Sequence, residues 1–233
     1  HLTDISELVV KEQADVGIVV DPDVDRLALV CEDGSMFGEE YTLVACADYV
    51  LGKLGGGNTV SNLSSSRALR DVTEKHGGTY TASAVGEVNV VIKMKETNTV
   101  IGGEGNGGII LPASHYGRDS LVGVALFLSH MATTKISCKA LRESYPSYFM
   151  SKNKIQLTPQ IDVDNILGIM ATKYANEEVN TIDGVKIDFE SQWVHLRKSN
   201  TEPIIRIYTE SNSQLNADEL AERFITEIKE IIA

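Results

Sequence analysis

Three short segments of the sequence concentrate residue types that bind metals, sugars or phosphates. The first contains the alternating aspartates Asp21, Asp23 and Asp25, followed by Arg26. In an extended backbone, alternate side chains point to one side, so these carboxylates are expected to converge on a hard cation. Mg²⁺ suits such a set, because it accepts a few carboxylates and keeps positions for water or a phosphate. A solvated acidic turn is the alternative.

The same aspartates and Glu32 also match the acidic positions of an EF-hand loop. Two features argue against that motif. Arg26 stands where an EF-hand needs glycine to turn the chain, and the preceding residues 16–20 form a β-branched apolar run rather than a helix. The pattern therefore favours a metal loop at the end of a strand.

The second segment is a glycine-rich loop at residues 102–108, in which five of the seven residues are glycine. Glycine lets the backbone approach a ligand closely. Glu104 supplies an acceptor and Asn106 a mixed donor and acceptor, which suits sugar hydroxyls. The loop matches neither the dinucleotide-binding pattern nor the P-loop. A glycine-rich turn without a ligand is the alternative.

The third segment combines cationic, hydroxyl and amide side chains in residues 197–206. Arginine forms forked, charge-assisted bonds to phosphate, and hydroxyls and successive N–H groups add further donors. In an acidic chain, such a cluster favours phosphate binding over an ordinary polar hairpin. The candidates are Arg197, Ser199, Asn200, Thr201 and Arg206. Lys198 is a weaker candidate, since flanking lysines often face solvent.

The composition excludes several classes of protein. The 233 residues contain 21 basic and 33 acidic side chains, a formal net charge of −12, which disfavours binding to nucleic acid or to an anionic membrane. No apolar run approaches about 18 residues, and the N-terminus lacks the pattern of a secretory signal. Three cysteines without metal-ligand spacing indicate reduced thiols and a cytoplasmic protein.

Hydrophobic periodicity predicts a mostly parallel α/β domain over residues 36–146. A first helix is expected through residues 43–54 and should end at the triple glycine 55–57, after which strands and helices alternate. The expected strands lie at 59–63, 79–82 and 99–101, and the expected helices at 66–76, 88–95 and 120–131.

The two ends of the chain differ from this region. Residues 1–35 read as strand, acidic loop and strand, which indicates the C-terminal part of another α/β domain. After a linker near Tyr145 and Pro146, residues 147–233 predict a small α+β domain. Its expected elements are a helix at 163–174, strands at 185–189, 193–196 and 204–208, and a closing helix that starts with a capping box at Asn216.

In this order, the three segments resemble the loops of the α-D-phosphohexomutase superfamily, which includes phosphoglucomutase, phosphomannomutase and phosphoglucosamine mutase. Asp21-Pro-Asp-Val-Asp-Arg26 resembles its metal loop, Gly103-Glu-Gly-Asn-Gly-Gly108 its sugar loop, and Arg197-Lys-Ser-Asn-Thr-Glu-Pro203 its phosphate loop. The resemblance covers essentially the whole chain, as the end of the second family domain and all of the third and fourth.

The resemblance implies an activity and a role for each candidate. The activity is phosphoryl transfer between the 6- and 1-positions of a hexose phosphate through a bisphosphate and an enzyme phosphoserine. The aspartates would hold Mg²⁺, and Arg26 would steady the transferring group. Glu104 and Asn106 would hold sugar hydroxyls, while the residues of the phosphate loop would grip the phosphate that is not reacting.

Two departures from the family pattern affect the expected activity. The family's phosphoserine lies in a Thr/Ser-Ala-Ser-His-Asn-Pro loop of its first domain, and no such loop occurs here. Ser114 lies after the sugar loop and lacks that context, so we do not expect it to be catalytic. Asn106 and Gly108 replace a common serine and histidine, which leaves the hexose open among glucosamine, mannose and glucose.

His115 and Arg118, which follow the sugar loop, either line the cleft or form a satisfied pair within the loop. These 233 residues are expected to bind hexose phosphates with Mg²⁺, as a monomer or homodimer, without turnover. Two alternatives from other classes are a non-catalytic sugar-phosphate-binding protein and an interaction module with a structural metal site.

Overall fold

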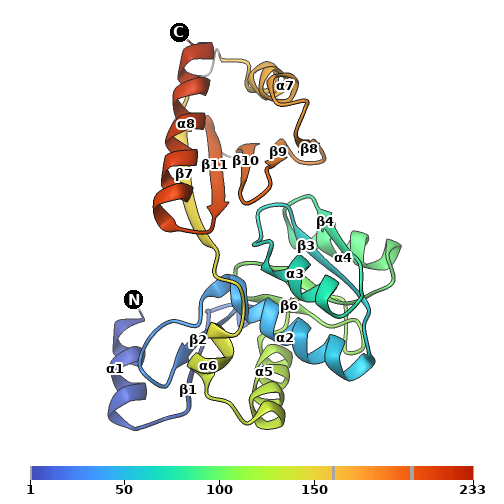
Figure 1. Cartoon of the computed structure of the whole chain (residues 1–233), viewed down its shortest axis with the longest axis vertical. Helices are drawn as coiled ribbons and strands as arrows, with labels where there is room; N and C mark the ends of the chain where they lie inside the picture. Colours follow the sequence, from blue (N-terminus) through green and yellow to red (C-terminus); the bar gives the residue numbers. More distant parts are fainter. Residues whose placement is uncertain (1, 159–160, 200–201, 233) are drawn as a thin grey trace. The chain divides into compact units, whose positions relative to one another are not determined.

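The alternating strands and helices of the sequence build a four-stranded sheet with the order β4-β3-β5-β6 (Figure 1). β3 (Asn58–Asn62) pairs in parallel with β4 (Tyr80–Ser83) and with β5 (Thr99–Glu104). β6 (Gly108–Ile110) is antiparallel to β5. The mostly parallel α/β class predicted from the sequence is confirmed.

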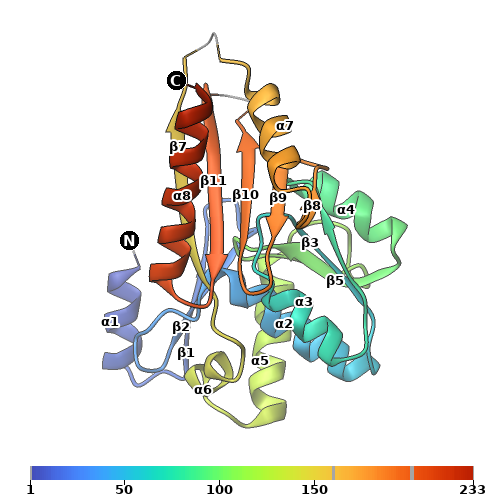
Figure 2. The ribbon, with the colours of Figure 1, turned by 45° about the horizontal axis from the view of Figure 1, so that its top comes forward.

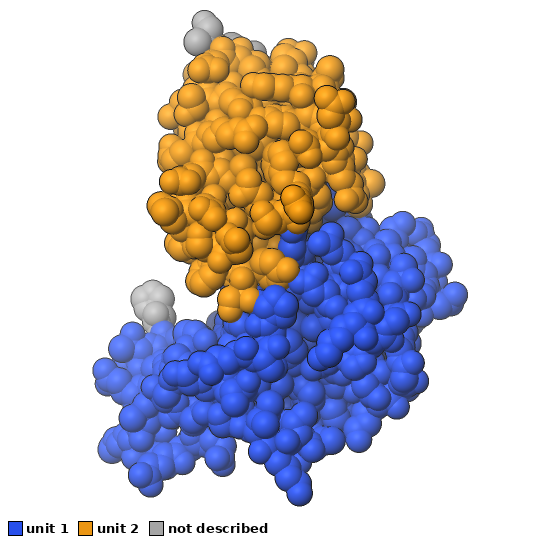
Figure 3. Space-filling model, in the orientation of Figure 1, with its two compact units in different colours: residues 1–146 blue, residues 147–233 orange. Residues whose placement is uncertain are grey.

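The computed structural model describes residues 2–158, 161–199 and 202–232. It divides the chain into two units, residues 1–146 and residues 147–233 (Figure 3). The four-stranded sheet belongs to the first unit.

Four helices accompany this sheet: α2 (Glu39–Leu54), α3 (Ala68–Lys75), α4 (Glu87–Glu96) and α5 (Ser120–Thr134). α2 packs against both α3 and α5, and α4 packs against β3 and β5. α2 ends where the triple glycine predicts, because Gly55 adopts the left-handed conformation that caps a helix (φ 74°).

A helix and two antiparallel strands precede the sheet in the chain. These are α1 (Thr3–Lys11), β1 (Val16–Val20) and β2 (Leu27–Cys31). The two strands were predicted, whereas α1 was not. β2 joins the rest of the unit through backbone hydrogen bonds, from Leu27 N–H to the carbonyl of Gly107 and from Phe37 N–H to that of Leu29.

The second unit contains an antiparallel sheet with the order β7-β11-β10-β9-β8. Its strands are β7 (Phe149–Gln156), β8 (Glu178–Asn180), β9 (Val185–Asp188), β10 (Trp193–Lys198) and β11 (Ile204–Ser211). β9, β10 and β11 lie where the sequence predicts strands. β7 was missed, because Ile155 is its one buried residue and the segment reads as a polar linker.

Helices α7 (Val163–Lys173) and α8 (Gln214–Ile232) cover one face of this sheet (Figure 2). The closing helix starts earlier than predicted. Ser213 rather than Asn216 caps it, since the Ser213 hydroxyl accepts a hydrogen bond from the N–H of Asn216 at 3.1 Å. A short helix, α6 (Cys138–Glu143), was also missed in the first unit.

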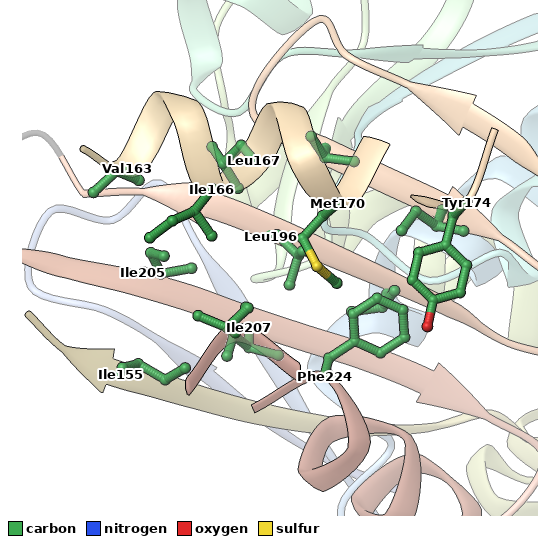
Figure 4. Packing of buried hydrophobic residues seen from close by; sticks show 14 of the residues in the cluster. Ile155, Val163, Ile166, Leu167, Met170, Tyr174, Leu196, Ile205, Ile207 and Phe224 are labelled. Carbon is green, nitrogen blue, oxygen red and sulfur yellow. The ribbon is translucent and has the colours of Figure 1, made fainter. Parts of the chain in front are cut away.

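The core of the second unit lies between the helices and the sheet (Figure 4). Leu196, Ile205 and Ile207 point from the sheet toward Met170 of α7 and Phe224 of α8. The Phe224 ring stacks on that of Tyr174 with centroids 5.0 Å apart.

Two further observations concern the class of the protein. None of the helices formed by the described residues has the length and apolar character needed to cross a membrane. Cys31, Cys46 and Cys138 are buried, and each has a free thiol in the structure.

Replacing the fully buried ring of Phe224 with a methyl group should destabilise the second unit. We expect Phe224→Ala to lower its free energy of unfolding by about 3–5 kcal/mol, because the change leaves a cavity. Trp193 is the only tryptophan and is fully buried in this unit, so its fluorescence during urea unfolding measures the change. The control Leu215→Ala, on the exposed side of α8, should cost less than about 1 kcal/mol. Equal losses in both variants would contradict the assigned core.

Candidate functional site

Polar residues gather where the parallel strands of the first unit end. Asn62 ends β3, Ser83 ends β4 and Glu104 ends β5. The chain passes from β3 to β4 and then crosses back to β5 on the other side of β3. In open α/β sheets, ligands bind outside the carboxyl ends of strands at such a switch point. The candidate site of this unit therefore lies between the ends of β3 and β5.

Glu104 is held rigidly at this point and is buried, with 4% of its surface exposed. Its Oε1 accepts hydrogen bonds from Nδ2 of Asn62 at 2.8 Å and from the N–H of Gly86 at 3.3 Å. Its Oε2 accepts from Nη1 of Arg118 at 2.9 Å. A carboxylate offers about four acceptor positions, so Glu104 retains capacity for about one further donor, such as a hydroxyl.

Arg118 binds three carboxylates that come from separate segments. Its Nη2 lies 2.5 Å from Oδ2 of Asp25, and its Nη1 binds Glu104. Its backbone N–H donates to Oε1 of Glu87 at 2.9 Å, and its Nε lies 3.5 Å from Oε2 of the same residue. One guanidinium thus connects the acidic loop, the glycine loop and the start of α4.

The acidic loop between β1 and β2 forms a tight turn, which corrects the extended backbone expected from the sequence. Val24 has a positive φ of 58°, and its N–H donates to the carbonyl of Asp21 at 3.0 Å. The side chain of Asp21 accepts from the N–H groups of Asp25 and Arg26, both at 3.2 Å, and from Nε of Arg26 at 2.7 Å. Turn geometry therefore sets the directions of the aspartates, and simple alternation does not.

The hydrogen bonds around Asp21 also affect its ionisation. Desolvation acts to raise the pKa of Asp21, but the hydrogen bonds from Arg26 and from the N–H of Asp25 outweigh it. The pKa of Asp21 therefore lies below its usual value, and the carboxylate stays charged at neutral pH.

The three aspartates do not form a metal cluster in the structure. Among the described residues, no three histidine, cysteine or acidic side chains are placed to share an ion. Asp21 turns to Arg26 and Asp25 to Arg118. The donor set nevertheless suits a hard cation, because Oδ1 of Asp25 is buried and accepts no hydrogen bond from the described residues. These carboxylates are chemically suited to Mg²⁺, although they are not converged on one point.

The glycine-rich segment forms a β-hairpin rather than a loop through all seven residues. Residues 102–104 belong to β5 and Gly108 begins β6, so residues 105–107 make the turn. Gly107 has a φ of 87°, and a Cβ there would overlap the carbonyl oxygen of Leu27. Glycine is therefore required at this position by contact with β2, where Arg26 and Gly108 form a β-bridge.

Asn106 lies at the tip of this hairpin and is half-buried. Its Oδ1 accepts from the N–H of Gly108 at 3.2 Å, and its Nδ2 contacts no acceptor in the part of the chain that the structure describes. Asn106, Asp21 and Arg26 line a surface hollow of about 300 Å³. The structure thus brings together residues of the acidic loop and of the glycine loop.

The segment between β3 and α3 also contributes to this site, and sequence reasoning missed it. The hydroxyl of Ser65 accepts from the N–H of Gly105 at 2.9 Å and donates to Oδ1 of Asn62 at 3.1 Å. Glu40 accepts from the N–H of Ser66 at 2.9 Å. The available signal was the run of three serines at 64–66, directly after a predicted strand. The predicted helix over 66–76 included the last of them, so the run was not recognised as part of a site.

His115 and Ser114 lie beside the site in an exposed turn. Nε2 of His115 is 2.9 Å from Oδ2 of Asp119, and Asp119 caps α5 by accepting from the N–H of Val122 at 3.0 Å. His115 thus contacts its own loop. Arg118, the other residue left open by the sequence, faces the site.

The third candidate segment lies in the second unit. Nη1 of Arg197 is 3.5 Å from Oδ2 of Asp183, and the N–H of Ser199 donates to the carbonyl of Ile204 at 3.1 Å. Arg206 lies directly opposite Arg197 in the β10–β11 register. Asn200 and Thr201, which complete the predicted phosphate loop, lie outside the described residues.

Lys198 turns the other way, toward the helices. Its Nζ is 3.1 Å from Oδ2 of Asp164, at the start of α7. The side chain of Lys198 therefore leaves the face that Arg197 occupies.

The first unit has an α/β fold with polar residues at the ends of its parallel strands, and the second unit has a small α+β fold. Comparisons with known proteins are more specific. The family model for the phosphoglucomutase/phosphomannomutase alpha/beta/alpha domain III matches residues 38–148. The model for the C-terminal domain of the same family matches residues 154–227. The chain belongs to the phosphoglucomutase/phosphomannomutase family, as its three loops predict.

Individual relatives agree with this assignment. A phosphoglucomutase/phosphomannomutase of Thermococcus kodakarensis is 32% identical over 100% of this chain and 51% of its own length. A probable phosphoglucosamine mutase of Methanopyrus kandleri is 29% identical over 100% of this chain and 52% of its own. The chain therefore spans about half the length of the curated relatives it matches.

Solved structures show the same fold. A phosphoglucomutase/phosphomannomutase family protein of Burkholderia thailandensis superimposes with a TM-score of 0.83 and 25% identity, covering 98% of this chain and 49% of that one. An Aspergillus fumigatus N-acetylphosphoglucosamine mutase in complex with GlcNAc-6P and magnesium has a TM-score of 0.62 and 14% identity, covering 88% of this chain and 50% of that one. The latter likeness establishes shared fold only.

Removing the Arg118 guanidinium should destabilise the first unit. We expect Arg118→Met to cost about 2 kcal/mol, because it leaves the buried Glu104 and the half-buried Asp25 without their cation, and solvent screens part of the loss. Hydrogen exchange of the β3 and β5 amides measures the change. Arg70→Met, on the surface of α3, is the matched control and should cost less than about 0.5 kcal/mol. If the β3 and β5 amides exchange at the same rate in Arg118→Met and in the wild type, Arg118 does not stabilise the unit by connecting these carboxylates.

Proposed function

We propose that this chain provides the metal-, sugar- and phosphate-binding residues of a phosphohexomutase. The reaction interconverts the 6-phosphate and 1-phosphate of glucosamine, mannose or glucose through a bisphosphate. The observation that carries the proposal is that one side chain joins the first two loops. The guanidinium of Arg118 binds Asp25 of the acidic loop and Glu104 of the glycine loop. The names of the relatives support the class of reaction.

The sugar would lie against the hairpin between β5 and β6. Glu104 would accept a hydroxyl through its remaining acceptor position, and Asn106 would donate through Nδ2. A bisphosphate must turn over in the site, so the sugar contacts have to serve two orientations. Fixed acceptors and donors do so, because each hydroxyl of a hexose both donates and accepts.

Charge neutralisation would come from the acidic loop and its arginines. Mg²⁺, when bound, would supply positive charge for the transferring phosphoryl group. Asp21, Asp23 and Asp25 would hold the ion. Arg26, whose side chain is 43% exposed, would remain able to contact an anion while it orients Asp21.

The phosphate that does not react would be gripped by the second unit. Arg197 and Arg206 would supply charge, and Ser199, Asn200 and Thr201 would add donors around the loop. The phosphoserine of the proposed reaction has no candidate in these 233 residues, since Ser114 lies in an exposed turn without the family context. The chain alone is therefore expected to bind substrate without turning it over.

Calorimetric titration with the 6-phosphates and 1-phosphates of glucosamine, mannose and glucose, in Mg²⁺, tests this proposal. We expect binding in the wild-type chain and a loss of at least about tenfold in Arg197→Ala, because a charge-assisted bond to phosphate disappears. Arg70→Ala removes the same charge elsewhere and should bind normally. Equal binding by all three proteins, or none in the wild type, would reject the proposed function.

A magnesium titration tests the acidic loop separately. Asp23 is exposed and contacts no cation among the described residues, so Asp23→Asn should leave the fold intact. We expect its affinity for Mg²⁺ to fall about tenfold, since one carboxylate ligand is lost. Asp15→Asn, an exposed aspartate outside the loop, is the control. If both variants bind Mg²⁺ with the same affinity, the acidic loop is not the metal site.

A further inference from the structure

One face of the five-stranded sheet in the second unit carries a row of cations. The helices α7 and α8 pack on the other face, where Ile155, Leu196 and Ile205 point into the core (Figure 4). Neighbouring residues in a strand point to opposite faces. Lys154, Arg206 and Arg197 therefore project from the face that these helices leave open.

The strand register places these three side chains side by side. Arg197 of β10 lies opposite Arg206 of β11, and Arg206 lies opposite Lys154 of β7. Side chains directly opposite in adjacent strands have Cβ atoms about 5 Å apart. Like charges at this separation destabilise a sheet, so the row is favourable when an anion lies against it.

The carboxylates of the described residues neutralise little of this charge. Arg197 has the carboxylate of Asp183 at 3.5 Å. Among the described residues, Lys154 and Arg206 form no ion pair. Three cations against one carboxylate leave two positive charges, in a chain whose net charge is −12.

Two neighbouring lysines outside the row contact aromatic rings or a carboxylate of the same unit. Lys152, two residues before Lys154, lies over the ring of Tyr208 at 5.8 Å. Lys186 is buried, 3.7 Å from Asp188 and 4.4 Å from the centre of the Trp193 ring. The unbalanced charge is therefore concentrated in the row formed by Lys154, Arg206 and Arg197.

We infer that Lys154 is a further phosphate-binding residue, which joins Arg206 and Arg197 in binding the dianion of a phosphomonoester. This inference rests on the phosphate-binding part of the proposed function, in which Arg197 and Arg206 contact the phosphate that does not react, and not on its sugar-binding part. The two unbalanced charges match a phosphomonoester, which carries close to two negative charges above its second pKa of about 6. A sulfate ester, with one charge, matches them less well.

Methyl phosphate and methyl sulfate, titrated into the whole isotope-labelled chain at about pH 8 and equal ionic strength, test the row directly by amide chemical shifts, because the first is a dianion and the second a monoanion. We expect methyl phosphate to shift the amides of β11 and β7 and to bind about fivefold more tightly than methyl sulfate. Lys154→Met should weaken the binding of methyl phosphate about fivefold and reduce the preference over methyl sulfate. Lys152→Met is the matched control on the same strand and face, and should stay within about twofold of the wild type. Trp193 fluorescence verifies the fold of each variant.

The outcomes separate this inference from the proposed function. Absence of phosphate binding in the wild type, or equal weakening by Lys154→Met and Lys152→Met, would overturn the inference. If the row binds methyl phosphate as expected but hexose phosphates bind no more tightly than methyl phosphate, the inference stands and the sugar-binding proposal fails. Restored affinity in Lys154→Arg would further support a direct role for the charge.

Discussion

The candidate site of the first unit depends on the contacts of one guanidinium. Arg118 binds Asp25, Glu87 and Glu104, which belong to the acidic loop, the start of α4 and the end of β5. A buried carboxylate is costly without a cation or several donors. Arg118 and the amide of Asn62 supply these for Glu104, and the same arginine holds the acidic loop beside the glycine hairpin. Any ligand in this part of the molecule meets groups whose positions Arg118 has already set.

The second unit presents the opposite electrostatic arrangement. In the first unit three carboxylates share the single guanidinium of Arg118, which leaves an excess of negative charge, whereas the second unit leaves two positive charges on an open sheet face. In the proposed arrangement an anion complements that face, because three cations there have one carboxylate partner among the described residues. In the proposed function the two units would therefore contribute different contacts, with hydroxyl and metal contacts from the first and phosphate contacts from the second.

Elements with strong periodicity were predictable. The parallel strands, α2 with its glycine stop, and the strands β9 to β11 follow directly from apolar patterns and turn residues. α1, α6 and β7 were not, because each is short or exposes most of its residues, as β7 does with Ile155 as its one buried side chain. The start of α8 was misplaced because Ser213 and Asn216 are both good caps, and only the hydrogen bond to the Ser213 hydroxyl distinguishes them.

The sequence by itself determined the kinds of residue in the three loops and the family to which they belong, because residue types and their order in a loop are local properties. Tertiary structure alone decided which of them meet. The turn at Val24 directs Asp21 to Arg26, the hairpin brings Gly107 against Leu27, and the register of three strands aligns Lys154 with Arg206 and Arg197. Such contacts join residues distant in the chain, and their geometry depends on packing that no local pattern records.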